Sequence, residues 1–366
     1  MSSEFPAIVQ RSGVRSWNEV LGRETTARDP IRIAGVAGRR VLVTGAGGFI
    51  GSEMARVLAA SGAERVVLLE IAEQALFDVD REMAVRGFGD QCVPVLGSVC
   101  DCALLRNLFE EHRPEVVLHA AALKHVPLME RNPFAAVETN ALGTWRLARA
   151  ANEHGVRRTV LVSTDKAVTP RSIMGASKKI AELAMLAHPE YTAVRLVNVI
   201  GSPGSVGPLF VEQIENGGPV TVTHPAAQRF FATLEEVAAL LAEALAADDA
   251  QGVLVPEPGE PVPIAELARR MIAASGHEVP VVFTELRAGE KLEESLVAPG
   301  EHCNRRVTAG LRRVAGPAVT ELDARIRALE DAVAERDLAM LLRVVEELVP
   351  DYEPSVLLRE AGCATR

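Results

Sequence analysis

From Arg40 onward the sequence alternates regularly between short apolar runs and helical patterns. The runs RVLVTG, RVVLLE, CVPVLG, EVVLHA, TVLVST and TAVRLVN are separated by amphipathic stretches such as IGSEMARVLAASG and CALLRNLFEEH. Strands that are apolar on both faces and alternate with helices are typical of a parallel sheet covered by helices on both sides. The pattern therefore predicts an α/β fold built on a doubly wound parallel sheet.

Changes in this pattern divide the chain into four parts. Residues 40–200 carry the strand–helix alternation, whereas residues 201–319 bring Gly and Pro into loops such as GSPGSVGP and EPGEPVP, and we expect them to form mainly a smaller substrate lobe. Residues 320–366 have apolar positions at helical spacing, which predicts two helices that break near Arg336 and Asp337. Residues 1–39 show weak periodicity, and we expect an extension that wraps the domain or a neighbouring molecule.

Composition excludes several classes of protein. The net charge of −10 and the lack of a basic stripe argue against a nucleic-acid surface. No stretch approaches the roughly 20 apolar residues of a membrane helix, and the N-terminus has no signal-peptide pattern, so we expect a cytoplasmic protein without a membrane partner. The five cysteines include no C-x-x-C pair, which favours reduced thiols over disulfides or a metal site.

The segment VLVTGAGGFIGSEMARVL places Gly45, Gly48 and Gly51 three residues apart between the first strand and a helix. Glycine at these points allows a tight turn, close approach of backbone N–H groups to a pyrophosphate, and close packing of helix on strand. The second strand ends in Glu70, whose carboxylate can bind both ribose hydroxyls of NAD and repel the 2′-phosphate of NADP. The alternative is a glycine turn followed by a solvated Glu. We favour an NAD site on a Rossmann-type sheet, formed by Thr44, Gly45, Gly47, Gly48, Phe49, Ile50, Gly51 and Glu70.

This glycine spacing, HAAALKH after the fourth strand, TNALGT in the next helix and Ser163 at the end of the fifth strand together resemble the extended short-chain dehydrogenase/reductase superfamily. The resemblance implies that Asn140 supports the central helix and that Lys178 holds the nicotinamide ribose and lowers the pKa of the catalytic hydroxyl. It also implies a nicotinamide pocket lined by Ala120, Ala121 and Ala122. Superfamily members usually dimerise through the helices that correspond to residues 132–153 and 172–186, which implies a homodimer or a larger homo-oligomer.

Longer segments are more specific. HAAALKHVPLMERNP, STDKAVTPRSIMGASK, GSPGSVGPLFVEQIENGGPVTVTHP and LRAGEKLEESL are similar to the polysaccharide-biosynthesis group of UDP-N-acetylglucosamine 4,6-dehydratases. Many relatives carry transmembrane helices before the LGR segment, whereas this chain begins almost at that point, so we expect it to resemble a soluble form of the group. It implies a lyase that oxidises C4 of a UDP-sugar with NAD, removes water across C5 and C6, and returns the hydride to C6.

The position where such enzymes often place a catalytic Tyr holds Met174, and a thioether cannot accept the proton of the 4-hydroxyl. The resemblance extends to this Met, which is common in the group. The neighbouring polar triplet offers other groups: we assign Lys166 as the base at C5, Asp165 as the acid at the C6 hydroxyl and Thr164 as a hydrogen-bond partner of O4. These roles require a neutral Lys beside a protonated Asp. The alternative is an ordinary polar turn at a strand end.

The substrate lobe offers cations and amides for a UDP-sugar. Arg229 lies where the superfamily places a diphosphate-binding Arg, and the planar guanidinium of Arg287 is a second candidate. Asn198 is expected at the diphosphate or sugar, and Lys124 at the sugar or near Asp165, while His125 is as easily structural. The substrate-binding candidates are therefore Lys124, Asn198, Arg229, Arg287 and Glu290, with Glu290 and Lys291 alternatively forming an internal ion pair.

Three positions depart from the usual pattern of the group. Glu70 stands where Asp is commoner, Ser98 where an Asp usually closes the adenine pocket, and Ala232 where a Met is usual, which leaves the hexose and its acyl group open. A UDP-sugar 4-epimerase shares the cofactor and the oxidation at C4, and a non-catalytic nucleotide-sugar-binding module would explain the missing Tyr. Residue types do not fix the stereochemistry at C5 or the biosynthetic pathway.

Overall fold

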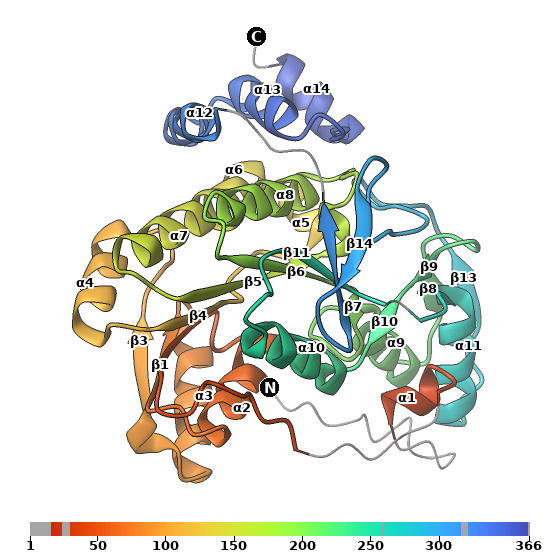
Figure 1. Ribbon diagram of the computed structural model, residues 1–366. Coiled ribbons are helices and arrows are strands. Elements are labelled where there is room, and N and C mark those ends of the chain that lie inside the picture. The colour runs from red at the N-terminus through yellow and green to blue at the C-terminus, as the bar shows by residue number, and fades with distance from the viewer. Residues whose placement is uncertain (1–15, 24–29, 258, 316–320, 365–366) are drawn as a thin grey trace.

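The computed structural model describes residues 16–23, 30–257, 259–315 and 321–364. Within these residues the centre is a nine-stranded sheet in the order β14-β15-β11-β6-β5-β4-β1-β2-β3 (Figure 1). Its parallel strands are β1 (Arg40–Thr44), β2 (Arg65–Glu70), β3 (Cys92–Leu96), β4 (Val116–His119), β5 (Arg158–Thr164), β6 (Thr192–Leu196) and β11 (Gly252–Pro256). An antiparallel hairpin of β14 (His302–Arg306) and β15 (Leu311–Ala315) extends one edge. The predicted doubly wound parallel sheet is confirmed.

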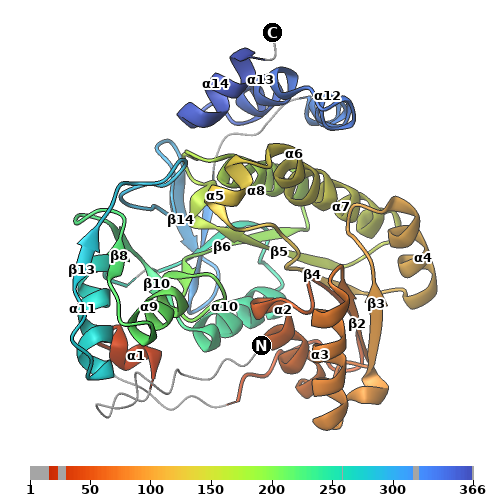
Figure 2. The same ribbon diagram turned by 180° about the vertical axis from the view of Figure 1, so that it is seen from behind.

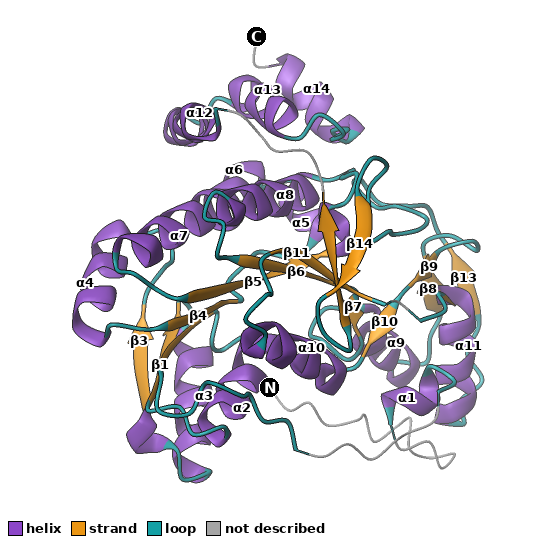
Figure 3. Ribbon diagram, viewed as in Figure 1, coloured by secondary structure: helices purple, strands orange, loops and turns teal. Residues whose placement is uncertain are grey.

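Helices cover both faces of this sheet, as the colours of Figure 3 show. One face packs against α2 (Phe49–Ala60), α3 (Glu73–Val85) and α10 (Leu234–Ala246), and the other against α4 (Cys102–His112), α7 (Gly143–Glu153) and α8 (Ile173–Leu186). Because both faces are covered, the central strands are apolar throughout rather than alternating. The strand order reverses between β1 and β4, and ligands of such sheets bind at that switch point, outside the carboxyl ends of the strands.

The smaller lobe has its own apolar core, around Phe210, Ile214, Leu267 and Met271. It consists of α9 (Val206–Glu215), α11 (Ile264–Ser275) and three strand pairs: β7 (Asn198–Val199) with β10 (Phe231–Ala232), β9 (Gln228–Arg229) with β12 (Val262–Pro263), and β8 (Val220–Val222) with β13 (Val281–Phe283). Residues 201–319, which we expected to form mainly this lobe, also contain α10, β11, β14 and β15, which belong to the main sheet and its helical cover.

The described parts of the N-terminal extension pack on both units of the same chain. Trp17, Val20 and Leu21, in and just after α1 (Trp17–Val20), lie against the core of the smaller lobe, while Ile33 and Val36 join the core beside the sheet. The remaining residues of the predicted extension, 1–15 and 24–29, lie outside the described residues.

Three helices form the C-terminal unit: α12 (Leu322–Glu335), α13 (Leu338–Leu348) and α14 (Val356–Ala364). The predicted break is confirmed, since Arg336 adopts a left-handed conformation with φ 59° and the Asp337 side chain caps α13 by accepting from the N–H of Met340. The apolar spacing predicted two helices here, and α14 is an additional one. Among the described helices, none is long and apolar enough to cross a bilayer.

The C-terminal unit lies over α8 and over the segment that precedes α7, on the side away from the sheet (Figure 2). That segment comprises α5 (Val126–Glu130), α6 (Pro133–Ala136) and the π-helical η3 (Val137–Leu142). Ile326, Leu329, Leu341 and Val345 share one apolar cluster with Leu142, Trp145, Ile180 and Ala184. The helices through which we expected a second subunit to bind thus give this face to the chain's own C-terminus.

Candidate active site

At the turn between β1 and α2, three glycines have no room for a side chain: Gly45, Gly47 and Gly51. Gly45 has a φ of 65°, and a Cβ there would lie 2.7 Å from Cα of Ala121, while a Cβ on Gly51 would overlap the carbonyl oxygen of Gly45. A Cβ on Gly47 would lie 2.6 Å from Cβ of Ala75. The turn leads into the N-terminus of α2 at the switch point of the sheet, where backbone N–H groups attract phosphate. A cradle that only glycine can form fits the pyrophosphate of a dinucleotide.

Glu70 is held at the mouth of this turn. Its carboxylate accepts hydrogen bonds from the N–H groups of Gly47 at 3.0 Å, Ile71 at 2.9 Å and Ala72 at 3.0 Å, and the residue is buried. The side chain therefore stands beside the glycine turn, where the adenosine ribose of a dinucleotide is expected.

Behind the turn lies a buried His that the sequence analysis overlooked. His119 Nδ1 is 2.6 Å from Thr44 Oγ1, and its Nε2 is 2.9 Å from Thr144 Oγ1. Thr144 donates its own proton to the carbonyl of Asn140 at 2.6 Å, so His119 must donate through Nε2 and accept at Nδ1. Burial, with Lys178 nearby, lowers the pKa of His119 to about 3, so the imidazole is neutral.

Two further contacts shape the expected nicotinamide pocket. The N–H groups of Ala120 and Ala121 donate to the carbonyl and the hydroxyl oxygen of Thr44, at 3.1 and 3.3 Å, which fixes the strand-end segment that leads to Ala122. Asn140 exchanges hydrogen bonds with the backbone of Leu123, at 2.8 and 2.9 Å, and donates to Ser177 Oγ at 3.0 Å. Asn140 thus joins this segment to α8, the supporting position that the resemblance implies.

Lys178 and Met174 lie one turn apart on α8. Lys178 Nζ donates to the carbonyl of Val162 at 2.7 Å, and burial lowers the pKa of Lys178 to about 8 even though Glu182 opposes the shift. Met174 is buried in the apolar cluster shared with the C-terminal unit. Its place in that cluster is consistent with a space-filling role for the thioether.

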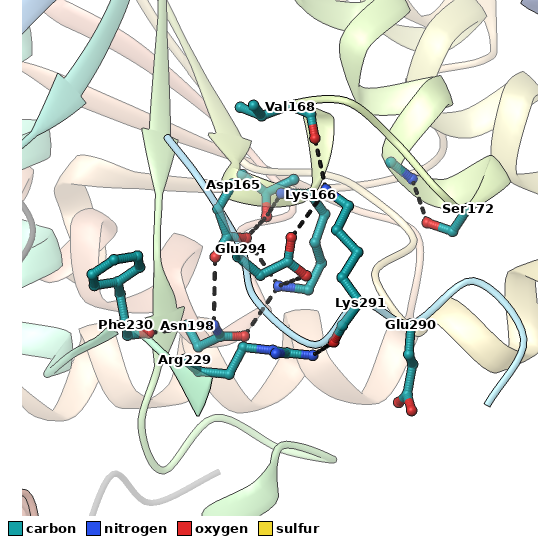
Figure 4. A network of polar contacts seen from close by, with 12 residues as sticks. Asp165, Lys166, Val168, Ser172, Asn198, Arg229, Phe230, Glu290, Lys291 and Glu294 are labelled. Atoms are coloured by element: carbon teal, nitrogen blue, oxygen red, sulfur yellow. Dashed lines mark hydrogen bonds and ion pairs between the residues drawn. The ribbon is translucent and has the colours of Figure 1, made fainter. Parts of the chain in front are cut away.

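Thr164 ends β5, and Asp165 and Lys166 lie in the short 3₁₀ turn η4 (Asp165–Ala167) that follows it. Figure 4 shows Asp165 and Lys166 side by side: Lys166 Nζ donates to Asp165 Oδ1 at 2.9 Å and to Asn198 Oδ1 at 3.1 Å. Thr164 Oγ1 also donates to Asp165 Oδ1, at 2.9 Å. Asp165 is fully buried whereas the Lys166 side chain is 22% exposed, so Lys166 is the member of the pair that is accessible from solvent.

The protonation of Lys166 differs from the expected one. Burial lowers the pKa of Lys166, but the charges of Asp165 and Glu294 outweigh it and raise the pKa above its ordinary value. The ligand-free site therefore holds an ammonium at Lys166 rather than the neutral amine that we expected. The expectation considered burial and one carboxylate, whereas the structure supplies two.

The second carboxylate, Glu294, was missed by the sequence analysis. Its side chain is 3% exposed, with Oε1 3.8 Å from Lys166 Nζ and Oε2 3.1 Å from Lys291 Nζ. The sequence contains two neighbouring glutamates after GEK, but only the fold shows that Glu294 turns inward while Glu293 is exposed.

The two arginines that we expect to bind the substrate differ in their surroundings. Arg229 donates to the backbone carbonyls of Gln228 at 2.7 Å, Lys291 at 2.6 Å and Leu292 at 2.8 Å, so it fastens the loop of residues 287–294 near Lys166. These bonds engage three of the five guanidinium donors. Arg287 is 58% exposed and pairs with Glu290 at 2.5 Å.

Those pairings correct one expectation and refine two others. Glu290 pairs with Arg287 rather than with Lys291, and it points away from the network in Figure 4. Asn198 lies next to the Asp165–Lys166 pair. Its amide oxygen accepts the hydrogen bond from Lys166, so the amide already interacts with the proposed catalytic groups. Lys124 reaches a different segment, where its Nζ donates to the carbonyl of Pro203 at 3.0 Å.

A buried network of ion pairs and hydrogen bonds stabilises the strand ends that carry the candidate site. Arg195 on β6 is fully buried and uses its five N–H donors on Glu182 of α8, on Glu301 and on the carbonyl of Leu296, at 2.6 to 2.9 Å. Ser163, just before the triplet, donates to Glu182 at 2.7 Å. The network thereby ties the ends of β5 and β6 to α8.

A family model described as polysaccharide biosynthesis protein matches residues 41–314. The chain belongs to this family. It is 42% identical over 294 residues to the probable polysaccharide biosynthesis protein EpsC of Bacillus subtilis (strain 168), an alignment that covers 77% of this chain and 49% of EpsC. The chain spans about half the length of the curated relatives it matches.

Solved structures share the fold. A double mutant of DesIV, a dTDP-glucose 4,6-dehydratase of Streptomyces venezuelae solved with NAD bound, is 26% identical with a TM-score of 0.62, covering 70% of this chain and 88% of DesIV. The UDP-glucose 4-epimerase of Thermus thermophilus in complex with NAD is also 26% identical, with a TM-score of 0.60, covering 69% of this chain and 89% of the epimerase. The expected Rossmann-type fold is confirmed.

Proposed function

We propose that this chain is an NAD-dependent 4,6-dehydratase of a UDP-N-acetylhexosamine, with UDP-N-acetylglucosamine as the first substrate to test. The observation that carries the proposal is the hydrogen-bonded pair of Lys166 and Asp165 at the carboxyl end of β5. An oxidation at C4 alone needs no acid–base pair at C5 and C6, whereas elimination of water needs a base and an acid. The dehydratase among the structural neighbours supports the same reaction class.

The glycine turn, Glu70, Ala120 to Ala122 and Lys178 would hold the NAD. The chemistry that NAD supplies when bound is removal of a hydride at C4 and its return at C6. Lys178, with a pKa of about 8, is poised to hydrogen-bond the nicotinamide ribose. Met174 takes no part in proton transfer in this proposal, because a thioether has no proton to give.

The proton path starts from a Lys166 that has lost its proton beside an ionised Asp165. The O4 proton passes to Thr164 Oγ1 while the Thr164 proton passes along the 2.9 Å hydrogen bond to Asp165. This step produces the neutral Lys and the protonated Asp that the elimination requires. Oxidation at C4 and preparation of the acid are therefore one event.

The elimination then uses both members of the pair. The Lys166 amine takes the C5 proton, made acidic by the neighbouring ketone, and Asp165 gives its proton to the C6 hydroxyl, which leaves as water. When the hydride reaches C6, the Lys166 ammonium returns its proton to C5. The pair ends as it began, and the O4 proton has left in the water molecule. Because Asp165 is buried beneath Lys166, the Lys side chain must turn toward C5 before Asp165 can reach C6.

Substrate binding is assigned to the lobe on the same side. Two N–H donors of Arg229 remain beyond its three backbone contacts, and we propose that they take a phosphate oxygen of the UDP group. Lys124 and Arg287 are proposed as further phosphate or sugar contacts, with Asn198 orienting Lys166 rather than binding the diphosphate.

Mass spectrometry tests the proposal. Purified protein is incubated with NAD and UDP-N-acetylglucosamine in deuterated water. The expected product has lost one water, and a fraction of it carries a solvent deuterium at C5, because two of the three protons of the Lys166 ammonium come from solvent. An isomer of unchanged composition would indicate the 4-epimerase, and unchanged substrate would indicate a binding module. Lys166→Ala should block elimination while reduced nicotinamide accumulates on the protein. Turnover by this variant at the wild-type rate would contradict the assigned roles.

A further inference from the structure

The loop of residues 287–294 lies next to the Asp165–Lys166 pair and is held there by hydrogen bonds. Arg229 donates to the carbonyls of Lys291 and Leu292, and Lys291 Nζ donates to the carbonyl of Val168 at 2.6 Å, just past the triplet (Figure 4). These contacts come from the lobe and from the sheet, so they fix the loop relative to both. The same contacts therefore fix the position of Glu294 next to Lys166.

Glu294 carries a buried negative charge between two ammonium groups. Its two oxygens lie 3.8 Å from Lys166 Nζ and 3.1 Å from Lys291 Nζ, and its side chain is almost completely removed from solvent. A carboxylate in such a place is costly unless it is paired. Lys291 already serves as one ion-pair partner of Glu294. Charge balance at Glu294 therefore does not by itself explain why Glu294 also lies close to Lys166.

Several elements contribute groups that face Lys166. Its own turn contributes Asp165, the loop contributes Glu294, β9 contributes Arg229, and β7 contributes the neutral amide of Asn198. Burial and Arg229 favour the amine, whereas Asp165 and Glu294 favour the ammonium, which prevails. When Asp165 becomes protonated during the reaction, its negative charge disappears. Glu294 is then the remaining carboxylate among these groups.

We propose that Glu294 is a positioning residue that makes Lys166 a strong base at the moment of elimination, by stabilising the ammonium formed when Lys166 takes the C5 proton. The inference rests on the proposed dehydratase function and deepens it. Asp165 cannot fill this role, because it is neutral at that step. A stronger base removes the C5 proton faster, at the cost of requiring a higher pH to be free of its own proton in the resting enzyme.

Two effects of opposite sign follow for Glu294→Gln. Loss of the charge should lower the pKa of Lys166 in the ligand-free protein by about one unit, the scale of an opposite charge within about 4–6 Å. The pH at which kcat/KM rises should decrease by the same amount. On the high-pH plateau, kcat should fall roughly tenfold because the base is weaker. A residue that only supports the loop would lower kcat without changing the pH at which kcat/KM rises.

The pKa of Lys166 can be measured without turnover, by the pH dependence of its acetylation relative to other lysines, read by peptide mass spectrometry. Glu293→Gln, an equal charge change at the exposed neighbour, is the matched control and should leave the Lys166 pKa unchanged. Glu294→Asp keeps the charge but places it farther from Lys166, so it should shift the pKa and lower the plateau less than Glu294→Gln does. If Glu294→Gln fails to fold, Glu294→Asp still decides, because its shortened side chain should give a smaller shift in the same direction.

Equal acetylation profiles for wild type and the Glu294 variants would overturn the inference. So would a fall in kcat with no change in the pH at which kcat/KM rises. Failure of the proposed function looks different: the protein would release no water from the sugar nucleotide, while the acetylation shift at Lys166 would still be measurable.

Discussion

Arg195→Met would remove the cation at the centre of the buried network while keeping most of the side-chain stem. The Arg195 guanidinium makes five hydrogen bonds, four of them to the carboxylates of Glu182 and Glu301, whose side chains are 1% and 7% exposed. After substitution Lys179, 3.5 Å from Glu182 and 3.0 Å from Glu301, is the ion-pair partner that both carboxylates keep among the described residues. Removing one partner of a buried ion pair costs about 3–5 kcal/mol. We expect the free energy of unfolding at pH 7 to fall by that amount.

The same network predicts the pH dependence of that loss. Burial would raise the pKa of Glu301, but Arg195 and then Lys179 overcome it and lower the pKa from 4.5 to about 2. Because the folded-state pKa is depressed, this stabilisation is present above pH 4.5 and disappears as the pH falls toward 2. The difference between wild type and Arg195→Met should therefore narrow over that interval, since the variant can protonate its unpaired carboxylates.

Urea unfolding followed by circular dichroism measures both effects, with the slope of the transition checked for constancy. Arg149→Met is a suitable control, because Arg149 pairs with Glu153 on the exposed face of α7 and should cost within about 0.5 kcal/mol. A loss under about 1 kcal/mol for Arg195→Met, or a loss independent of pH down to 2, would refute the reasoning.

Three other tests, using five substitutions, address the cofactor turn and the catalytic assignments. Glu70→Ala should relax the preference for NAD over NADP in calorimetric titrations, because the 2′-phosphate loses its repulsion; unchanged discrimination would place Glu70 away from the ribose. Gly51→Ala should abolish NAD binding through collision with the turn, whereas Gly48→Ala, whose Cβ would meet its nearest neighbour at 3.1 Å, should weaken it less; equal affinities would contradict this reading of the cradle. Met174→Leu should keep substantial dehydration in the mass-spectrometric assay, whereas Lys166→Ala should lose roughly 10²-fold or more, and the reverse result would show that the chemistry lies elsewhere.

Sequence patterns predicted the parts of the site that belong to single elements. The glycine turn, Glu70 at the end of β2 and the triplet at the end of β5 could be placed together because carboxyl ends of parallel strands share one edge of the sheet. The strand pattern also predicted the sheet itself. It could not predict that β11, β14 and β15 would join that sheet, because short strands of the same composition occur in the lobe.

Contacts between the lobe and the sheet had no signature in the sequence. Glu294 reaches Lys166 because Arg229 binds backbone carbonyls of the intervening loop, and any residue could supply those carbonyls. The pairing of Glu290 was equally hidden: Arg287 and Lys291 both lay within reach along the chain, and the fold of the loop selected Arg287. Residue types thus identified the charges, whereas their partners followed from the path of the backbone.

The C-terminal helices give the helix that carries Met174 and Lys178 an intramolecular cover. Where two subunits cover each other's central helices, the stability of those helices depends on protein concentration through mass action. Here the apolar residues of α13 that pack on α8, and those of α12 that pack on the neighbouring η3, belong to the same chain, so their local concentration is fixed by covalent connection. The helix beneath the proposed nicotinamide pocket is therefore expected to stay folded on dilution to the nanomolar concentrations of a kinetic assay.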